Sequence, residues 1–271
     1  MKPGAGPAPT GRRRRPPVLA AGLAATAALF FVLPLAGLLW RAPWATLAGD
    51  LTAPEVRTAL RLSLVTSLAA TAVSFALGIP LAWVLARVEF PGRRLLRALT
   101  TLPMVLPPVV GGVALFFAFG RRGLLGGWLD ATFGIRLPFT TAGAVMAEAF
   151  VAMPFLVITA EAAFRSLDQR YEEAARTLGA GRWTVFRRVT LPLCAPALAA
   201  GAVLCWARAL GEFGATITFA GNFPGTTQTM PLAVYLALET RPELAITLSL
   251  VLLVVSLAVL VGLRDRWMGV S

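Results

Sequence analysis

Long uncharged runs alternate with short polar segments along this chain. Val18 to Trp40 carries no charged residue, and Glu243 is followed by a second uncharged run from Leu244 to Leu263. About 20 apolar residues in a helix cross the hydrocarbon core of a bilayer, which is roughly 30 Å thick. The pattern predicts an all-α membrane protein with about six transmembrane helices. The expected spans are 18–40, 60–86, 98–119, 141–162, 192–220 and 243–263.

Composition supports the membrane class and excludes several chemistries. Apolar residues make up 57% of the chain and charged residues only 14%. The single lysine is Lys2, so the chain lacks the G-x-x-x-x-G-K-[ST] loop with which many ATPases bind nucleotide phosphates. There is no His, and Cys194 and Cys205 alone are too few to hold zinc or haem. We therefore expect no catalytic residue, no metal site and no cofactor in this chain.

The distribution of positive charge predicts the orientation in the membrane. A net charge of +12 could suggest nucleic-acid binding, but the basic residues lie between the apolar spans, where topology determinants belong. Placing the N-terminus in the cytoplasm puts most of the 25 Lys and Arg residues inside, including Arg12–Arg15. The positive-inside rule therefore predicts an N-in, C-in protein with the loop 163–190 in the cytoplasm, and we expect no nucleic-acid partner.

The same pattern divides the chain into four segments. Residues 1–17 form a basic, Pro- and Gly-rich tail that we expect to be disordered. Residues 18–58 hold the first transmembrane helix and an outer loop; this apolar run is too long for a secretory signal, so we expect it to remain uncleaved. Residues 59–263 form the core, and residues 264–271 form a cytoplasmic tail.

Prolines interrupt the predicted spans. The densest site runs from Pro103 through Pro107 and Pro108 to Gly111 and Gly112. Proline frees a carbonyl and kinks a membrane helix, so this segment is the best candidate for a hinge. Ordinary kinking in a static bundle explains any single proline equally well.

The loop 163–190 has the pattern of two short helices joined at glycines. Tyr171 to Leu178 predicts a helix with acidic residues in its first turn, Gly179 and Gly181 allow a tight turn, and Trp183 to Val189 predicts a second helical piece. Small alanines leave room for a neighbouring protein to approach. The residues that carry this pattern are Glu173, Ala174, Ala175, Gly179, Leu191 and Pro192.

The order Glu-Ala-Ala, Gly and Leu-Pro in this loop resembles the EAA loop of bacterial ABC-importer permeases. The resemblance implies a type I ABC-importer permease fold. It also implies that the short helix docks in a separate ATPase subunit, which would bind ATP and Mg. The six residues above would then couple that ATPase to the membrane subunit. A solvated loop without a partner is the alternative.

A second polar group lies within the fifth span and the loop after it. Arg208 and Glu212 are four residues apart, so they share a helix face and can pair. Charges inside a membrane usually face a bundle interior or an aqueous cavity, so the pair is either a structural ion pair or part of a gate. Thr216, Thr218 and Asn222 are better candidates than a carboxylate to donate hydrogen bonds to a passing oxyanion.

The segment from Ala209 to Tyr235 resembles the molybdate ABC transporter permeases. It contains the run Ala-Leu-Gly-Glu-Phe-Gly-Ala-Thr and, further on, Asn-x-Pro-Gly-x-Thr-Gln-Thr-x-Pro-Leu-Ala-Val-Tyr. The resemblance implies a homodimeric permease in a bacterial inner membrane. It would receive molybdate, or tungstate, from an extracytoplasmic binding protein and perform no covalent chemistry.

Two alternatives stay open. Sulfate and thiosulfate permeases share the Gly-Glu-Phe/Tyr-Gly core, and sulfate is a tetrahedral dianion like molybdate. A secondary transporter or a membrane scaffold without an ATPase is a more remote alternative, because the sequence contains no extended internal repeat of the kind that such transporters often have.

Overall fold

The computed structural model describes residues 17–267, with side chains up to Val261, and all of its regular elements are helices. The basic N-terminal tail expected for residues 1–17 lies outside this range except for Pro17. The chain divides into a first unit that ends at Ala42 and a second that begins at Pro43, and each is described by itself. The first unit holds one helix, α1 (Val18–Trp40), which is apolar along its whole length.

The second unit contains the remaining elements. In chain order they are α2 (Leu47–Thr52), α3 (Pro54–Arg87), α4 (Arg93–Thr101), the 3₁₀ turn η1 (Leu102–Met104), α5 (Pro108–Phe119), α6 (Gly126–Phe133), α7 (Thr141–Ser166), α8 (Gln169–Thr177), α9 (Arg182–Val185), the π-helical turn η2 (Phe186–Thr190), α10 (Leu191–Leu210), α11 (Gly214–Ala220), α12 (Met230–Thr240) and α13 (Pro242–Trp267). Several of them begin at proline, which lacks the N–H that a first helical turn leaves unpaired.

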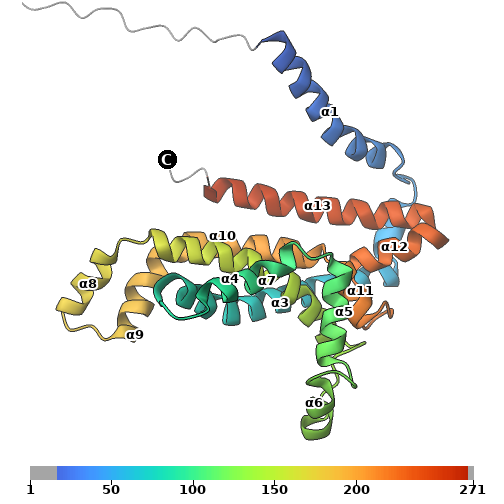
Figure 1. The fold of residues 1–271 in the computed structure, drawn as a ribbon. Coiled ribbons are helices and arrows are strands. Elements are labelled where there is room, and N and C mark those ends of the chain that lie inside the picture. The colour runs from blue at the N-terminus through green and yellow to red at the C-terminus, as the bar shows by residue number, and fades with distance from the viewer. Residues whose placement is uncertain (1–16, 268–271) are drawn as a thin grey trace, which may run out of the picture. The chain divides into compact units, whose positions relative to one another are not determined.

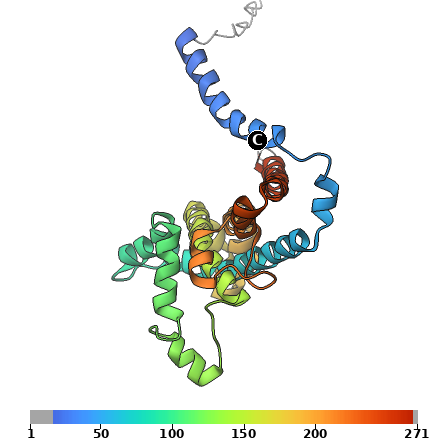
Figure 2. The ribbon, with the colours of Figure 1, turned by 90° about the vertical axis from the view of Figure 1, so that its right-hand side faces the viewer.

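The number of membrane-spanning helices agrees with the prediction. Within the described residues, five helices are long and apolar enough to cross a bilayer, and a sixth span results if α4 and α5 count as one bent span. α3, α7 and α10 pack against one another and α13 packs chiefly against α12, while α5 and α6 extend away from the bundle in both views (Figures 1 and 2).

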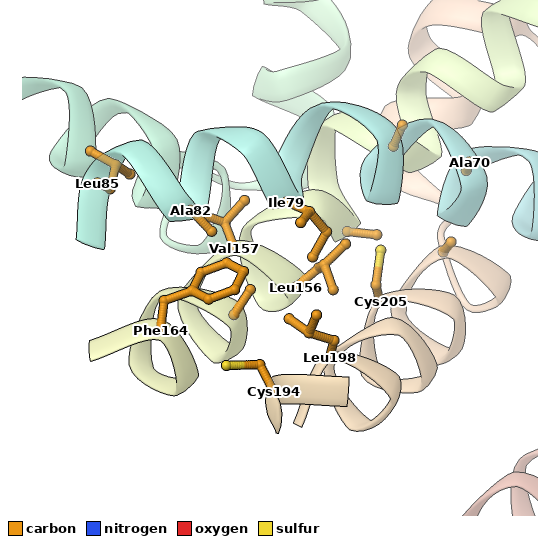
Figure 3. Close-up of a cluster of buried hydrophobic side chains, with 14 residues drawn as sticks. Ala70, Ile79, Ala82, Leu85, Leu156, Val157, Phe164, Cys194, Leu198 and Cys205 are labelled. Carbon is orange, nitrogen blue, oxygen red and sulfur yellow. The ribbon is translucent and has the colours of Figure 1, made fainter. Parts of the chain in front are cut away.

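The main core lies between α3, α7 and α10. Side chains from all three helices point into one cluster, among them Ile79, Leu156 and Cys205 (Figure 3). Glycines let the backbones approach closely: a Cβ on Gly78 would lie 3.1 Å from Val157, and small residues at such crossings are typical of membrane helix pairs. The relative positions of α3, α7 and α10 therefore depend on close packing of their backbones and not only on the apolar character of their side chains.

A row of buried hydroxyl side chains crosses this packing. It lies on one face of α3, at positions i, i+3, i+4 and i+11, and comprises Ser63, Thr66, Ser67 and Ser74. Trp206 Nε1 donates a hydrogen bond to Ser67 Oγ at 2.9 Å, and the backbone N–H of Met230 donates to Ser63 Oγ at 2.7 Å. The row holds α3 to α10 and α12 by specific hydrogen bonds, which non-directional apolar contacts cannot do.

Two predicted spans are not the continuous helices that we expected. The span 98–119 is broken, and its two parts, Arg93–Met104 and Pro108–Phe119, meet at an angle of 118°. The break falls at Pro107 and Pro108, because a proline disfavours helical geometry in the residue before it and removes a backbone donor. The span 192–220 ends as α10 at Leu210 and resumes as α11 at Gly214, since the chain leaves the helix at Gly211.

Candidate functional site

The loop 163–190 folds as two short helices joined by a glycine turn. α8 begins after Asp168, whose Oδ1 accepts a hydrogen bond from the backbone N–H of Arg170 at 3.0 Å. At the other end, the N–H of Gly179 donates to Arg176 O at 2.9 Å and that of Ala180 donates to Ala175 O at 3.0 Å. This pair of bonds is the Schellman motif, which closes a helix with a left-handed residue.

Gly179 is that left-handed residue. Its φ is +86°, a region that residues with a Cβ adopt only at a cost, and a Cβ placed there would meet nothing within 4 Å. The glycine is therefore required by the backbone of the turn and not by crowding within this chain. Gly181, by contrast, has a φ of −66°, which any residue can adopt.

Several large apolar side chains of this loop are exposed. Tyr171 is 59% exposed, Leu178 89% and Trp183 70%. Glu173 and Ala174 are exposed as well, whereas Ala175 is half-buried. Trp183 stacks on Phe186 with ring centroids 5.7 Å apart. We call the set Tyr171, Glu173, Ala174, Leu178 and Trp183 the loop surface; it is the part of this loop that is free for contact with a partner.

The remaining two residues of the predicted loop pattern lie where the chain enters α10. Leu191 is half-buried and packs against the core between α3, α7 and α10. Pro192 is exposed in the first turn of α10, a position that tolerates proline. The loop is thus joined directly to one of the three core helices.

Arg208 and Glu212 form the ion pair that their spacing allowed. Arg208 Nη2 lies 2.6 Å from Glu212 Oε2, and Glu212 is 1% exposed. The other carboxylate oxygen accepts a hydrogen bond from the backbone N–H of Ala215 at 2.8 Å, in the first turn of α11. A negative group is favourable at a helix N-terminus, so Glu212 joins the end of α10 to the start of α11.

The three candidate oxyanion donors have different surroundings. Thr216 is fully buried, and its hydroxyl has no hydrogen-bond partner among the described residues. Thr218 donates to Gly214 O at 2.7 Å within α11. Asn222 follows the helix and is half-buried, and its amide donates to Leu232 O at 3.5 Å. Of the three, Thr216 is therefore the one whose donor group has no hydrogen-bond partner among the described residues.

α11 crosses α5 at a contact made by glycines. A Cβ on Gly112 would lie 2.7 Å from Thr218 Cβ and 2.8 Å from Ala215 O, while one on Gly214 would lie 2.9 Å from Pro108 Cβ. Such distances leave no space for a side chain. α11, which follows the break after α10, is consequently packed tightly against α5, which follows the break after α4 and η1.

Glu148 is a buried acid in α7 that is not among the predicted site residues. It is 1% exposed, and its Oε1 accepts a hydrogen bond from Thr66 Oγ1 on α3 at 2.8 Å. Its Oε2 is buried without a partner among the described residues. Two features of the sequence point to it: an acidic residue inside an apolar run, and Ser and Thr residues on one face of α3.

The two groups of candidate residues are separated. The loop 163–190 joins α10 at its first residue, whereas Glu212 follows its last, and a helix of 20 residues is about 30 Å long. Figure 1 shows α8 and α9 at one end of the bundle and α11 and α12 towards the other. Among the described side chains, residues 17–261, no three His, Cys, Asp or Glu gather in a way that could hold a metal ion.

Comparison with known proteins identifies relatives over most of the chain. Residues 78–270 match the family described as "Binding-protein-dependent transport system inner membrane component". The "Molybdenum transport system permease protein ModB" of Mycobacterium tuberculosis is 49% identical over 238 residues, covering 88% of this chain and 90% of that protein. The "Sulfate transport system permease protein CysT" of Escherichia coli is 41% identical over 214 residues, covering 78% of this chain and 77% of that protein.

A solved structure supports the same fold. The crystal structure of a bacterial ABC transporter involved in the import of alginate contains a chain that matches with a TM-score of 0.74. The match covers 94% of this chain and 96% of that chain, at 20% sequence identity. This likeness confirms the predicted fold class, the all-helical fold of ABC-importer permeases.

Proposed function

Since the chain belongs to the family of inner-membrane components of binding-protein-dependent transport systems, we propose that it is the permease subunit of an ATP-driven molybdate importer. It is a multi-pass protein of the inner membrane. The assignment of molybdate as the substrate rests on the 49% identity to a molybdenum permease, which extends over 90% of that relative.

The loop surface is the proposed docking site for a separate ATPase subunit. Its exposed tyrosine, leucine and tryptophan provide apolar area, and Glu173 provides a charge at the rim. Ala174 and Ala175 keep the helix narrow, Gly179 shapes the turn, and Leu191 and Pro192 connect the loop to α10. ATP and Mg are bound by that partner and hydrolysis occurs there; this chain contributes movement and no covalent chemistry.

The path for the anion is proposed to lie near the break between α10 and α11. Arg208 offers positive charge, and its side chain is 27% exposed beside the buried Glu212. Thr216, Thr218 and Asn222 follow within one short helix and its end, where hydroxyl and amide groups can donate hydrogen bonds to a tetrahedral oxyanion. Glu212 holds the geometry of this segment and is not a ligand, because a carboxylate repels an anion.

Two further partners complete the assembly. An extracytoplasmic binding protein delivers the anion, and a second copy of this chain forms the other half of a homodimeric pathway. The N-in, C-in orientation puts the loop surface on the cytoplasmic side, where an ATPase is present. ATP drives transport only if it favours one conformation of the permease over the other.

Sulfate is the second candidate substrate, because the sulfate permease of Escherichia coli is 41% identical. Uptake of labelled molybdate and labelled sulfate at submicromolar concentration separates the two, in cells with and without this gene. Loss of molybdate uptake alone is the expected result. Loss of sulfate uptake instead would retain the permease assignment and replace the substrate, and unchanged uptake of both would refute the proposed function.

A further inference from the structure

The two adjacent glutamates of α8 lie in opposite environments. Glu173, which belongs to the Glu-Ala-Ala pattern, is exposed on the loop surface, whereas Glu172 is 9% exposed and turned towards the bundle. A buried carboxylate needs partners, because removing a charge from water is costly. The contacts of Glu172 therefore indicate what α8 is attached to.

Glu172 connects α8 to the ends of two core helices. Its Oε1 accepts a hydrogen bond from Thr190 Oγ1 at 2.8 Å, and Thr190 immediately precedes α10. The same oxygen lies 3.4 Å from Arg87 Nη2, and Arg87 is the last residue of α3. Arg176 of α8 itself is 3.9 Å from the other carboxylate oxygen. One carboxylate thus joins α8 to the end of α3, 85 residues earlier in the chain, and to the residue before α10.

Two of the three partners of Glu172, Thr190 and Arg87, are also shielded from water. Thr190 is 1% exposed, and the side chain of Arg87 is 11% exposed. A buried ion pair is costly to break, because separation leaves both charges desolvated. When α8 is displaced, α3 and the start of α10 are therefore pulled with it. The covalent route from α8 to α10 passes through the turn at Gly179 and Gly181, where an added Cβ would meet nothing within 4 Å.

The network also retains one uncommitted donor. Arg87 Nε is buried and has no partner within the described part of the chain. A buried N–H without an acceptor is unfavourable, so the network is incomplete at this atom.

We infer that Glu172 is a positioning residue that relays movement of the loop surface to α3 and α10 through Arg87 and Thr190. Glu172 itself does not contact the ATPase; its neighbour Glu173 lies on the docking side. The inference rests on the proposed function, because it assigns how an ATPase bound at the loop surface would move the membrane helices.

The test uses the complete transporter, with its ATPase subunit and binding protein, in proteoliposomes. Two rates are measured for each variant: ATP hydrolysed and molybdate transported. Glu172→Gln removes the charge of the relay, and Glu89→Gln makes the same change at an exposed glutamate between α3 and α4, outside the loop surface. Because coupling between two sites typically amounts to a factor of roughly 5 to 150, we expect Glu172→Gln to lower molybdate transported per ATP by about fivefold or more. Glu89→Gln should leave both rates and their ratio at the wild-type value.

A merely structural role for Glu172 predicts a different result. Loss of folded permease lowers hydrolysis and transport together and leaves their ratio at the wild-type value, which would overturn the inference. The reversed pair, Arg87→Glu with Glu172→Arg, is expected to recover part of the ratio lost in either single variant, and no recovery would also overturn it. If Glu172→Gln does not assemble, Thr190→Val is the second variant, because it removes one hydrogen bond from the same carboxylate. A wild-type ratio of molybdate transported to ATP hydrolysed in Thr190→Val would overturn the inference.

The proposed function is tested separately in the wild-type preparation. Failure of the wild-type complex to bind an ATPase subunit or to transport molybdate would refute the permease assignment or its substrate. Normal wild-type transport with an unchanged ratio in Glu172→Gln would refute the relay alone.

Discussion

Gly179→Ala is the most direct test of the loop geometry. The residue has a φ of +86°, and an alanine there costs about 1–2 kcal/mol of backbone strain. No steric term adds to this cost, because a Cβ would meet nothing within 4 Å. A change of that size shifts an equilibrium by about 5- to 30-fold, here against the native turn. The loop surface would then be displaced while the membrane helices remain folded.

The chain offers two matched controls. Gly181→Ala adds the same methyl group two residues away, also in open space, but at a φ of −66° that alanine adopts without strain. Gly179→Asn restores most of the wild-type behaviour, since asparagine tolerates the left-handed region better than alanine does. A bulky residue such as leucine at position 179 adds a side chain on the exposed side and is expected to abolish uptake.

The assay is uptake of labelled molybdate by cells whose own permease is deleted, with the amount of permease in the membrane measured by immunoblot. We expect a loss of about 5- to 30-fold for Gly179→Ala at an unchanged membrane level, and normal uptake for Gly181→Ala. Equal uptake by the two alanine variants would refute the argument from backbone conformation. Normal uptake by Gly179→Leu would refute the coupling role of the loop.

Three other substitutions test the bundle. Gly112→Ala places a Cβ 2.7 Å from that of Thr218, and the overpacking should cost about 1–3 kcal/mol of stability. The expected result is a lower melting temperature of the detergent-solubilised protein. An unchanged melting temperature would contradict the α5–α11 contact. Thr66→Val removes the 2.8 Å donor to buried Glu148 and should cost about 1–3 kcal/mol, with Thr66→Ser as the control that retains the hydroxyl. Glu212→Gln keeps an acceptor for the start of α11, so it should melt above Glu212→Ala; the reverse order would exclude that hydrogen bond as a stabilising contact.

The sequence alone determined the class of protein, the order of its spans and the design of the loop. Uncharged runs long enough to cross a bilayer leave few alternatives to transmembrane helices, because lipid offers no partner for an exposed backbone. The loop 163–190 was predictable for a similarly local reason: a helix, a glycine at a left-handed position and a second helical piece depend on residues within a few positions of one another. The structure has helices from Gln169 to Thr177 and from Arg182 onward, each within two residues of the predicted start.

Only the tertiary structure decided which polar residues are buried and what they hold together. Glu172 and Glu173 are chemically identical neighbours, and packing against α3 and α10 buries the first while the second stays exposed. Glu148 receives its hydrogen bond from a residue 82 positions earlier in the chain, a pairing that no local pattern contains. Periodicity indicates that polar groups share one face of a helix. The partner that meets that face is set by the close packing of helices far apart in the sequence.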